Sequence, residues 1–166
     1  MSGSLLRTDK EIEEIYRRQI DAVYRVCFAY MKNPADAEDA AQETFFRLIR
    51  SGPVFENEEH EKAWLIRTAS NVCKNALRHW WRRREDIEDH PELPSREDGA
   101  PDDVLRAVMA LPPKYKTPVY LYYYEGYASS EIADILKKPA STVRSHLREA
   151  RAILRERLGE DFIEEQ

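Results

Sequence analysis

The 166-residue sequence predicts an all-α protein made of two small helical domains joined by a flexible acidic linker. Apolar residues recur at spacings of three and four in several long runs, which is the period of an amphipathic helix. Between these runs, residues 85–100 are rich in proline and carboxylates. Such a stretch buries too little apolar surface to order itself, so it predicts a linker between a domain at 1–84 and one at 101–166.

Three amphipathic helices are expected before the linker. The second spans about 34–50, with Asn33 as its N-cap and proline at its first position. The third begins near His60, after an acidic loop. The first helix is expected over about 8–31, and its apolar face contains Ile12, Tyr16, Val23, Cys27 and Tyr30. The stripe of the third contains Leu65, Ala69, Val72, Ala76 and Trp80.

The segment after the linker predicts a helix-turn-helix. Short helices are expected at 102–110, at 115–124 and within 126–136, and a final helix at 140–158. The turn before the final helix has the sequence Lys-Lys-Pro, where a glycine and an apolar residue are usual. In the final helix the stripe expected to be buried is Val143, Leu147, Ala150, Leu154 and Leu158. A short helix, a tight turn and a basic second helix are typical of this motif.

The distribution of charge favours a nucleic-acid partner, although the formal net charge is −5. Residues 62–84 contain seven basic residues and no acidic one, and residues 137–157 contain seven basic residues against two acidic ones. Residues 85–103 contain nine carboxylates and one arginine. Two basic surfaces are therefore separated by an acidic connector, which we expect to limit DNA binding by the isolated protein through repulsion of phosphates or by covering the basic faces.

Several classes of protein have little support. No apolar run approaches the ~20 residues of a membrane span, and no signal peptide is evident, so we expect a cytoplasmic protein that does not insert into membranes. Cys27 and Cys73 lie inside amphipathic patterns without a Cys-x-x-Cys spacing, and we interpret both as core residues. Because no nucleophile–base pair, metal cluster or phosphate loop appears, we expect neither an enzyme nor a metal or cofactor site.

The final helix carries the predicted contacts to duplex DNA. A recognition helix places its N-terminal side chains near base edges in the major groove, while flanking cations hold phosphates. A basic solvated face on a helical bundle is the alternative. The side chains expected nearest the bases are Ser141, Thr142, Arg144, Ser145 and Arg148, with Arg151 and Arg155 nearer the backbone.

The other two candidate surfaces lie on the second and third helices. Aromatic side chains beside cations suit single-stranded nucleic acid, because exposed bases stack on rings. These aromatics are Phe55, Trp64, Trp80 and Trp81, although Trp80 also fits a core position. The neighbouring polar row is Arg67, Asn71, Lys74, Arg78 and Arg82. An acidic cluster on the second helix suits a basic protein partner, with helix-dipole compensation as the alternative. It comprises Asp36, Asp39, Gln42 and Glu43, with Phe46 beside them.

Two blocks of sequence resemble a known family. The segments DAEDAAQETFFRL at 36–48 and AWLIRTASNVCKN at 63–75 resemble region 2 of bacterial sigma factors of the extracytoplasmic-function (ECF) group. The segments LPPKYK at 111–116, YYYEGY at 122–127, EIA at 131–133 and TVRSHLREAR at 142–151 resemble region 4 of the same group. The resemblance covers nearly the whole chain outside the linker.

The resemblance implies a role for each candidate surface. Asp39, Gln42, Glu43 and Phe46 match the helix that docks on the clamp of RNA polymerase core. Phe55, Glu56 and Asn57 match the loop that captures a flipped base of the minus-ten element. Trp64, Arg67, Asn71, Lys74 and Arg78 match the helix that contacts that element and separates its strands. The final helix matches the reader of the minus-thirty-five duplex. The implied partners are polymerase core, at its clamp and flap regions, promoter DNA and an anti-sigma protein.

Three other functions compete with the sigma-factor hypothesis. A response-regulator-like protein or repressor shares the helix-turn-helix but binds DNA without polymerase, and a helical adaptor contacts only protein. An enzyme is the most distant alternative. Dependence on polymerase core discriminates among these alternatives.

Overall fold

The computed structural model describes residues 7–83 and 103–158, and within these ranges the side chains of residues 7–79 and 105–156. All regular structure in these ranges is helical, which confirms the predicted fold class. The chain divides into two compact units, called here unit 1 (7–83) and unit 2 (103–158). The predicted linker at 85–100 and the side chains of Trp80, Trp81, Arg82 and Leu158 lie outside the described part.

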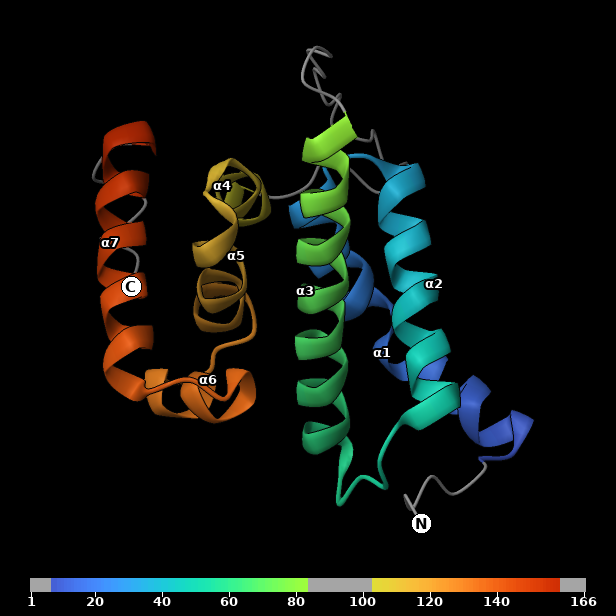
Figure 1. Cartoon of the computed structure of the whole chain (residues 1–166). Coiled ribbons are helices and arrows are strands. Elements are labelled where there is room, and N and C mark those ends of the chain that lie inside the picture. The colour runs from blue at the N-terminus through green and yellow to red at the C-terminus, as the bar shows by residue number, and fades with distance from the viewer. Residues whose placement is uncertain (1–6, 84–102, 159–166) are drawn as a thin grey trace. The chain divides into compact units, whose positions relative to one another are not determined.

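Unit 1 is a bundle of three helices, α1 (Asp9–Met31), α2 (Pro34–Ser51) and α3 (Glu58–Arg83), each of which packs against the other two (Figure 1). Its centre is apolar and closed to solvent. Burying one of its larger aliphatic side chains contributes about 1.5–3 kcal/mol. Fully buried members of this core are Val23, Cys27, Leu48, Leu65, Ile66 and Ala69. Cys27 and Cys73 are both buried free thiols, which confirms them as core residues.

The helix ends of unit 1 follow from local capping chemistry. The Thr8 hydroxyl accepts from the Glu11 backbone N–H at 3.1 Å, and the Glu11 carboxylate accepts from the Thr8 N–H at 3.3 Å. This capping box starts α1. Asn33 caps α2 as predicted, because its Oδ1 accepts from the Asp36 N–H at 2.9 Å. Between the two helices, Lys32 takes a left-handed conformation with φ 66°.

The face of α1 and the start of α3 differ from the sequence predictions. Tyr16 was expected on the buried face of α1 but is 47% exposed, because Ile15 and Gln19 take the inward positions. The Tyr16 ring instead packs on Phe45, with the centroids 4.9 Å apart. Helix α3 begins at Glu58 rather than near His60. The expected acidic loop is therefore partly the first helical turn, where carboxylates favour the positive end of the helix.

Unit 2 contains α4 (Asp103–Ala110), α5 (Pro113–Val119), a π-helical turn η1 (Tyr120–Tyr124), α6 (Ser129–Leu136) and α7 (Ala140–Leu158). Helix α7 packs against α5 and α6, while α4 packs against α5 and η1 (Figure 1). The stripe predicted on α7 is confirmed for its four described members, all of which are buried. Other core residues are Val108, Val119, Leu121 and Ile132.

The segment expected as one helix over 115–124 begins at Pro113 and changes form at Tyr120. Pro118 has no N–H, so the α-helical bond to the carbonyl four residues earlier is missing there. The turn then widens, and the Glu125 N–H donates to the Tyr120 carbonyl, five residues back, at 3.2 Å. Such π turns are rare and are found disproportionately at functional sites.

Helices α6 and α7 form the predicted helix-turn-helix. Lys137 adopts the left-handed conformation, with φ 55° and ψ 49°, at the position where glycine is usual. The Lys138 N–H closes the turn on the Ala133 carbonyl at 3.0 Å. The Pro139 carbonyl accepts from the N–H groups of Thr142 and Val143 in the first turn of α7. The lysine-lysine-proline sequence therefore makes the tight turn, and α7 starts at Ala140 as predicted.

None of the helices described in the two units combines the length and apolarity that crossing a lipid bilayer requires.

Candidate nucleic-acid and protein interfaces

The outer face of α2 is a mixed apolar and charged surface, which we call the α2 face and define by Asp39, Gln42, Glu43, Phe46 and Ile49. Phe46 is 58% exposed and Ile49 is 48% exposed, so two large apolar side chains face solvent. Exposed apolar side chains at adjacent helical positions are typical of a protein-binding surface.

The charges of the α2 face are partly balanced within the helix. The Glu43 carboxylate accepts from Arg47 Nε at 3.1 Å and from Arg50 Nη2 at 3.2 Å. The Arg50 guanidinium also lies 5.7 Å from the centre of the Phe46 ring. The anionic character inferred from sequence is therefore reduced at Glu43, while Asp39 and Gln42 remain exposed. Ile49 was missed, although it lies three residues after Phe46 and so shares its face.

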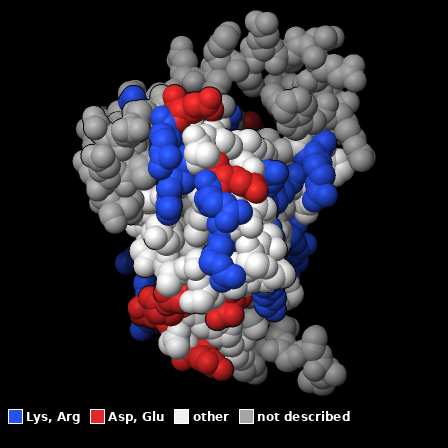
Figure 2. All heavy atoms as spheres, turned by 90° about the vertical axis from the view of Figure 1, so that its left-hand side faces the viewer, with Lys and Arg blue, Asp and Glu red and all other residues white. Residues whose placement is uncertain are grey.

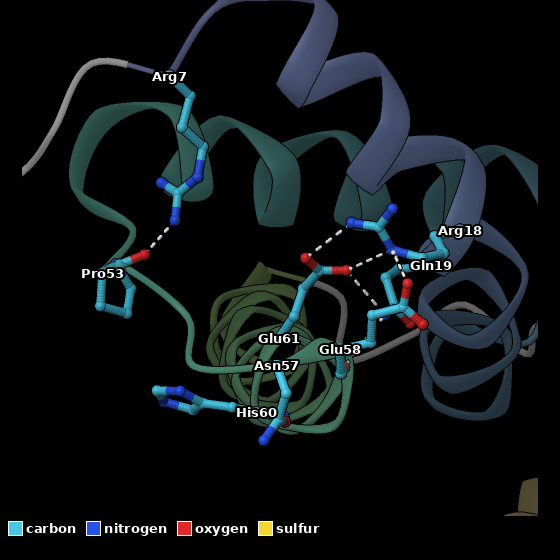
Figure 3. A network of polar contacts seen from close by, with 8 residues as sticks. All are labelled: Arg7, Arg18, Gln19, Pro53, Asn57, Glu58, His60 and Glu61. Carbon is cyan, nitrogen blue, oxygen red and sulfur yellow. Dashed lines mark hydrogen bonds and ion pairs between the residues drawn. The ribbon is translucent and has the colours of Figure 1, made fainter.

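The loop between α2 and α3, residues 52–57, is held in place by an arginine that precedes α1 (Figure 3). Arg7 donates to the Gly52 carbonyl at 3.2 Å and to the Pro53 carbonyl. Its guanidinium lies 5.0 Å from the centre of the Phe55 ring. Residue 52 is a glycine because the loop packs closely on α2: a Cβ atom there would lie 2.6 Å from the Leu48 carbonyl oxygen. No sequence pattern pointed to Arg7.

Phe55, the aromatic residue of this loop, is half-buried between side chains of α3. Its ring meets the His60 ring edge-on at 5.3 Å and the Trp64 ring at 5.9 Å. Trp64 is itself half-buried. The structure therefore brings Phe55 and Trp64, predicted separately from the sequence, into one aromatic group with His60.

The polar residues of the loop have different surroundings. The Asn57 side chain caps α3, since its Oδ1 accepts from the His60 N–H at 2.8 Å. The Glu56 N–H donates to His60 Nδ1 at 3.2 Å, and the Glu56 side chain is exposed. Asn57 is thus used in local structure, although both side chains are exposed.

An ion pair between a buried carboxylate and a partly exposed arginine connects the first turn of α3 to α1 (Figure 3). Glu61 is 5% exposed, and its two carboxylate oxygens accept from Arg18 Nε and Nη2, each at 3.0 Å. The Gln19 amide also donates to Glu61 at 3.0 Å. The hydrogen bond to Glu61 raises the pKa of Arg18, so the guanidinium stays charged. A carboxylate usually faces solvent, whereas Glu61 points inward to these two partners.

An open pocket of about 310 Å³ lies between the start of α1, this loop and Glu61. Its lining combines both ion-pair partners with apolar and aromatic surface. The lining residues are Arg7, Glu11, Glu14, Ile15, Arg18, Val54, Phe55 and Glu61.

The predicted polar row of α3 lies beside the buried stripe of the same helix. Asn71 and Arg78 are exposed, while Arg67 and Lys74 are half-buried. Arg78 donates to the Asn75 side chain one turn earlier. Because Leu65, Ala69 and Val72 are buried, α3 has a fixed orientation in unit 1 that turns Asn71 and Arg78 to solvent. Ala76, expected in the stripe, is half-buried.

Arginine side chains gather along the outer face of α7 (Figure 2). Arg144, Arg148 and Arg155 are exposed, and Arg151 is half-buried. At the start of the helix Ser141 is exposed, whereas Thr142 and Ser145 are half-buried. The predicted row of cations is therefore accessible, and the basic helix presents it opposite the buried stripe.

Glu149, one of the two acidic residues of α7, is bound to α5. The Tyr115 hydroxyl donates to the Glu149 carboxylate at 2.8 Å. The Tyr115 ring also meets the His146 ring edge-on at 5.6 Å. The hydrogen bond directs the Glu149 charge towards α5, which lowers its repulsion of an anion at the arginine row.

No group of three or more histidine, cysteine or carboxylate side chains within the described ranges is arranged to hold a metal ion.

Comparison with known proteins identifies both units. Residues 15–83 match the family model of sigma-70 region 2, and residues 102–154 match that of sigma-70 region 4. The chain is 33% identical to the ECF RNA polymerase sigma factor SigE of Mycolicibacterium smegmatis, over 89% of this chain and 61% of that protein. It is 28% identical to the ECF sigma factor SigW of Bacillus subtilis, over 89% and 87% of the two chains.

Two further relatives extend this comparison. The RNA polymerase sigma-E factor of Streptomyces coelicolor is 32% identical, over 89% of this chain and 86% of that one. Among solved structures, the sigma factor RpoE of Bartonella quintana, in complex with the anti-sigma factor NepR, matches with a TM-score of 0.73 and 20% identity. That match covers 89% of this chain and 96% of the other, and it supports the fold.

Proposed function

The chain belongs to the sigma-70 family of RNA polymerase sigma factors, within the ECF group, and from this membership we propose how its two units divide promoter recognition. As a sigma factor, it binds RNA polymerase core and directs transcription initiation at promoters. In our proposal, residues 1–84 bind core and the minus-ten element, residues 101–166 bind the minus-thirty-five duplex, and residues 85–100 link them.

The α2 face is the proposed contact with the polymerase clamp. Its exposed Phe46 and Ile49 supply apolar area, which dominates the energy of protein interfaces when it becomes desolvated. Asp39 and Gln42 are accessible beside them and suit a basic, hydrogen-bonding partner. A second contact, with the polymerase flap, belongs to residues 101–166 in this proposal.

The loop at 52–57 and α3 form the proposed minus-ten site. Separating the strands costs a few kcal/mol for each disrupted step, and capture of an extruded base offsets part of that cost. Phe55 and Trp64 offer ring surface for stacking, and Glu56 offers an acceptor at the rim of the loop. Arg67, Asn71, Lys74 and Arg78 would follow the strand along α3. Asn57 would act here chiefly by capping α3.

Helix α7 is the proposed reader of the minus-thirty-five duplex. A helix fits the major groove, and its first turns reach the base edges. Ser141, Thr142, Arg144, Ser145 and Arg148 are the proposed base contacts, and Arg151 and Arg155 the phosphate contacts. Bound in this way, unit 2 would fix the position of polymerase relative to the start site.

The observation that carries this division is the presence of unit 1 in the same chain as the helix-turn-helix. A repressor-type protein needs only a DNA-binding unit such as unit 2, whereas unit 1 adds an apolar α2 face and an aromatic loop. Both features serve a protein that docks on polymerase and holds unpaired DNA. Such a protein works in the cytoplasm, where the polymerase is. It is also a candidate for binding an anti-sigma protein, as RpoE does in its solved complex.

Run-off transcription with purified core polymerase tests the proposal. We expect transcripts that start at defined promoters only when the chain is added to core. Binding of duplex DNA without any transcript from a genomic library of promoters would favour a repressor-type protein instead.

Two substitutions test the division between the units. Arg148→Ala should weaken binding to the minus-thirty-five duplex by roughly 1–3 kcal/mol and leave core affinity unchanged, because it removes a single base contact. Phe46→Ala should weaken core binding and spare duplex binding. If Arg148→Ala abolished core binding and spared DNA, the assignment of the units would be wrong.

A further inference from the structure

The π turn η1 holds one arginine of the α7 row. Arg151 Nε donates to the Tyr123 hydroxyl oxygen at 3.3 Å. Arg144, Arg148 and Arg155 of the same row are exposed, whereas Arg151 is half-buried against this tyrosine. Since all four arginines lie one residue after a buried position of α7, the difference comes from the tyrosine and not from the direction of Arg151 on the helix.

The turn that carries Tyr123 is itself braced. The Tyr122 and Tyr123 rings meet edge-on at 4.9 Å, and the Tyr120 and Tyr124 rings stack at 5.1 Å. The Tyr120 hydroxyl donates to the Glu125 carboxylate at 2.6 Å. Rings paired in this way have little rotational freedom, so the Tyr123 hydroxyl is presented at a fixed place beside α7.

Resting on the proposed role of α7 in duplex binding, we propose that Tyr123 is a positioning residue that holds Arg151 ready for a phosphate of the minus-thirty-five DNA backbone. An arginine that uses Nε for one partner keeps its terminal amino groups for others, and these groups suit a phosphate.

Electrostatics and entropy support this arrangement. The hydrogen bond to Tyr123 raises the pKa of Arg151, so the guanidinium stays charged in the pair. A long side chain that is free before binding loses rotamer freedom when it contacts a phosphate. Tyr123 orders Arg151 in advance and removes part of that loss. The exposed arginines of the row lose their rotamer freedom only when they bind.

The test is a double-mutant cycle on the full chain assembled with core polymerase. The probe is a fluorescent promoter duplex, selected from a randomised pool by the wild-type holoenzyme. Tyr123→Phe removes only the hydroxyl and should weaken binding roughly two- to tenfold. Arg151→Gln should weaken binding and lower the slope of log K against log salt by about 0.9, the value for one phosphate. In the Arg151→Gln background, Tyr123→Phe should have no further effect.

Tyr124→Phe is the matched control, because it removes a hydroxyl from the same turn and leaves the Tyr123–Arg151 bond intact. It should bind DNA as the wild type does, and thermal unfolding of all variants shows whether unit 2 is intact. Equal losses from Tyr123→Phe in both backgrounds, tighter binding by Tyr123→Phe, or no change would each overturn the inference. Failure of the wild-type holoenzyme to select any duplex would instead contradict the proposed function.

Discussion

Removal of Arg18 tests how α3, and with it the proposed minus-ten site, is held in unit 1. Arg18→Ala leaves the Glu61 carboxylate, which is 5% exposed, without its bidentate partner. Breaking a buried ion pair in this way typically costs about 3–5 kcal/mol. The cost here should be lower, about 2–3 kcal/mol, because the Arg18 side chain is 36% exposed and Gln19 keeps one hydrogen bond to Glu61.

The size of unit 1 converts this cost into a measurable shift. In a domain of this size 1 kcal/mol corresponds to roughly 4–8 °C, so the unfolding midpoint of unit 1 should fall by roughly 8–24 °C. All three tryptophans of the sequence precede residue 84, so tryptophan fluorescence reports on the unfolding of the amino-terminal half alone.

Arg17→Ala is the matched control, because Arg17 makes an exposed pair with Glu13 one turn away at 2.6 Å. Such a pair contributes about 0.5 kcal/mol or less, so the midpoint should move by only a few degrees. Adding Glu61→Gln to Arg18→Ala should recover part of the loss, since it removes the uncompensated charge. Equal shifts for Arg17→Ala and Arg18→Ala, or no recovery, would refute this reasoning.

The dependence on pH follows from the direction of the Arg18 shift. Its pKa is raised in the folded protein, so the stability it provides is present at every pH below its ordinary value. That stability is lost only when the pH rises through the folded pKa, in strong alkali. The destabilisation by Arg18→Ala should therefore be the same at pH 7 and pH 9, and a clear decrease at pH 9 would contradict the assignment.

Three further predictions concern the loop, the turn and Glu149 of α7. Arg7→Ala should release the 52–57 loop and weaken holoenzyme binding to a single-stranded minus-ten oligonucleotide by roughly tenfold. Fluorescence anisotropy measures this binding, and an unchanged Kd would exclude the role of Arg7. Lys137→Gly should stabilise unit 2 by about 0.5–1 kcal/mol, because glycine tolerates a φ of 55°. A lower unfolding midpoint in circular-dichroism melts would contradict this prediction. Tyr115→Phe should free the Glu149 charge and weaken duplex binding most at low salt; equal loss at all salt concentrations would argue against repulsion.

Much of the fold follows from local sequence rules. The period of apolar residues located all three helices of unit 1, and Asn33 with Pro34 fixed the start of α2 because capping is a short-range interaction. Helix α7 has the predicted bounds because its apolar period is also a local signal. The errors arose where tertiary packing or a proline, and not the apolar period, decides the outcome. Tyr16 faces solvent because Ile15 and Gln19 face inward, and α5 widens into a π turn after Pro118.

The candidate surfaces show the same division. The arginine row of α7 and the exposed Phe46 were predicted, because each depends on the face of a single helix. The contact of Arg7 with the 52–57 loop joins residues more than forty positions apart, and the Glu61 ion pair does likewise. No local pattern reports such contacts. Carboxylates usually face solvent, so the sequence alone predicts an exposed Glu61. Its burial is explained by its hydrogen-bonded partners Arg18 and Gln19.

Permanganate footprinting of a promoter bound by core polymerase and this chain tests the central claim most directly. We predict reactive, unpaired thymines at the minus-ten element only when both components are present. Asn71→Ala should lose this reactivity while gel shifts still show the closed complex, and Arg148→Ala should weaken the closed complex itself. Equal loss of reactivity and of closed binding in both variants would contradict the division of promoter recognition between the two units.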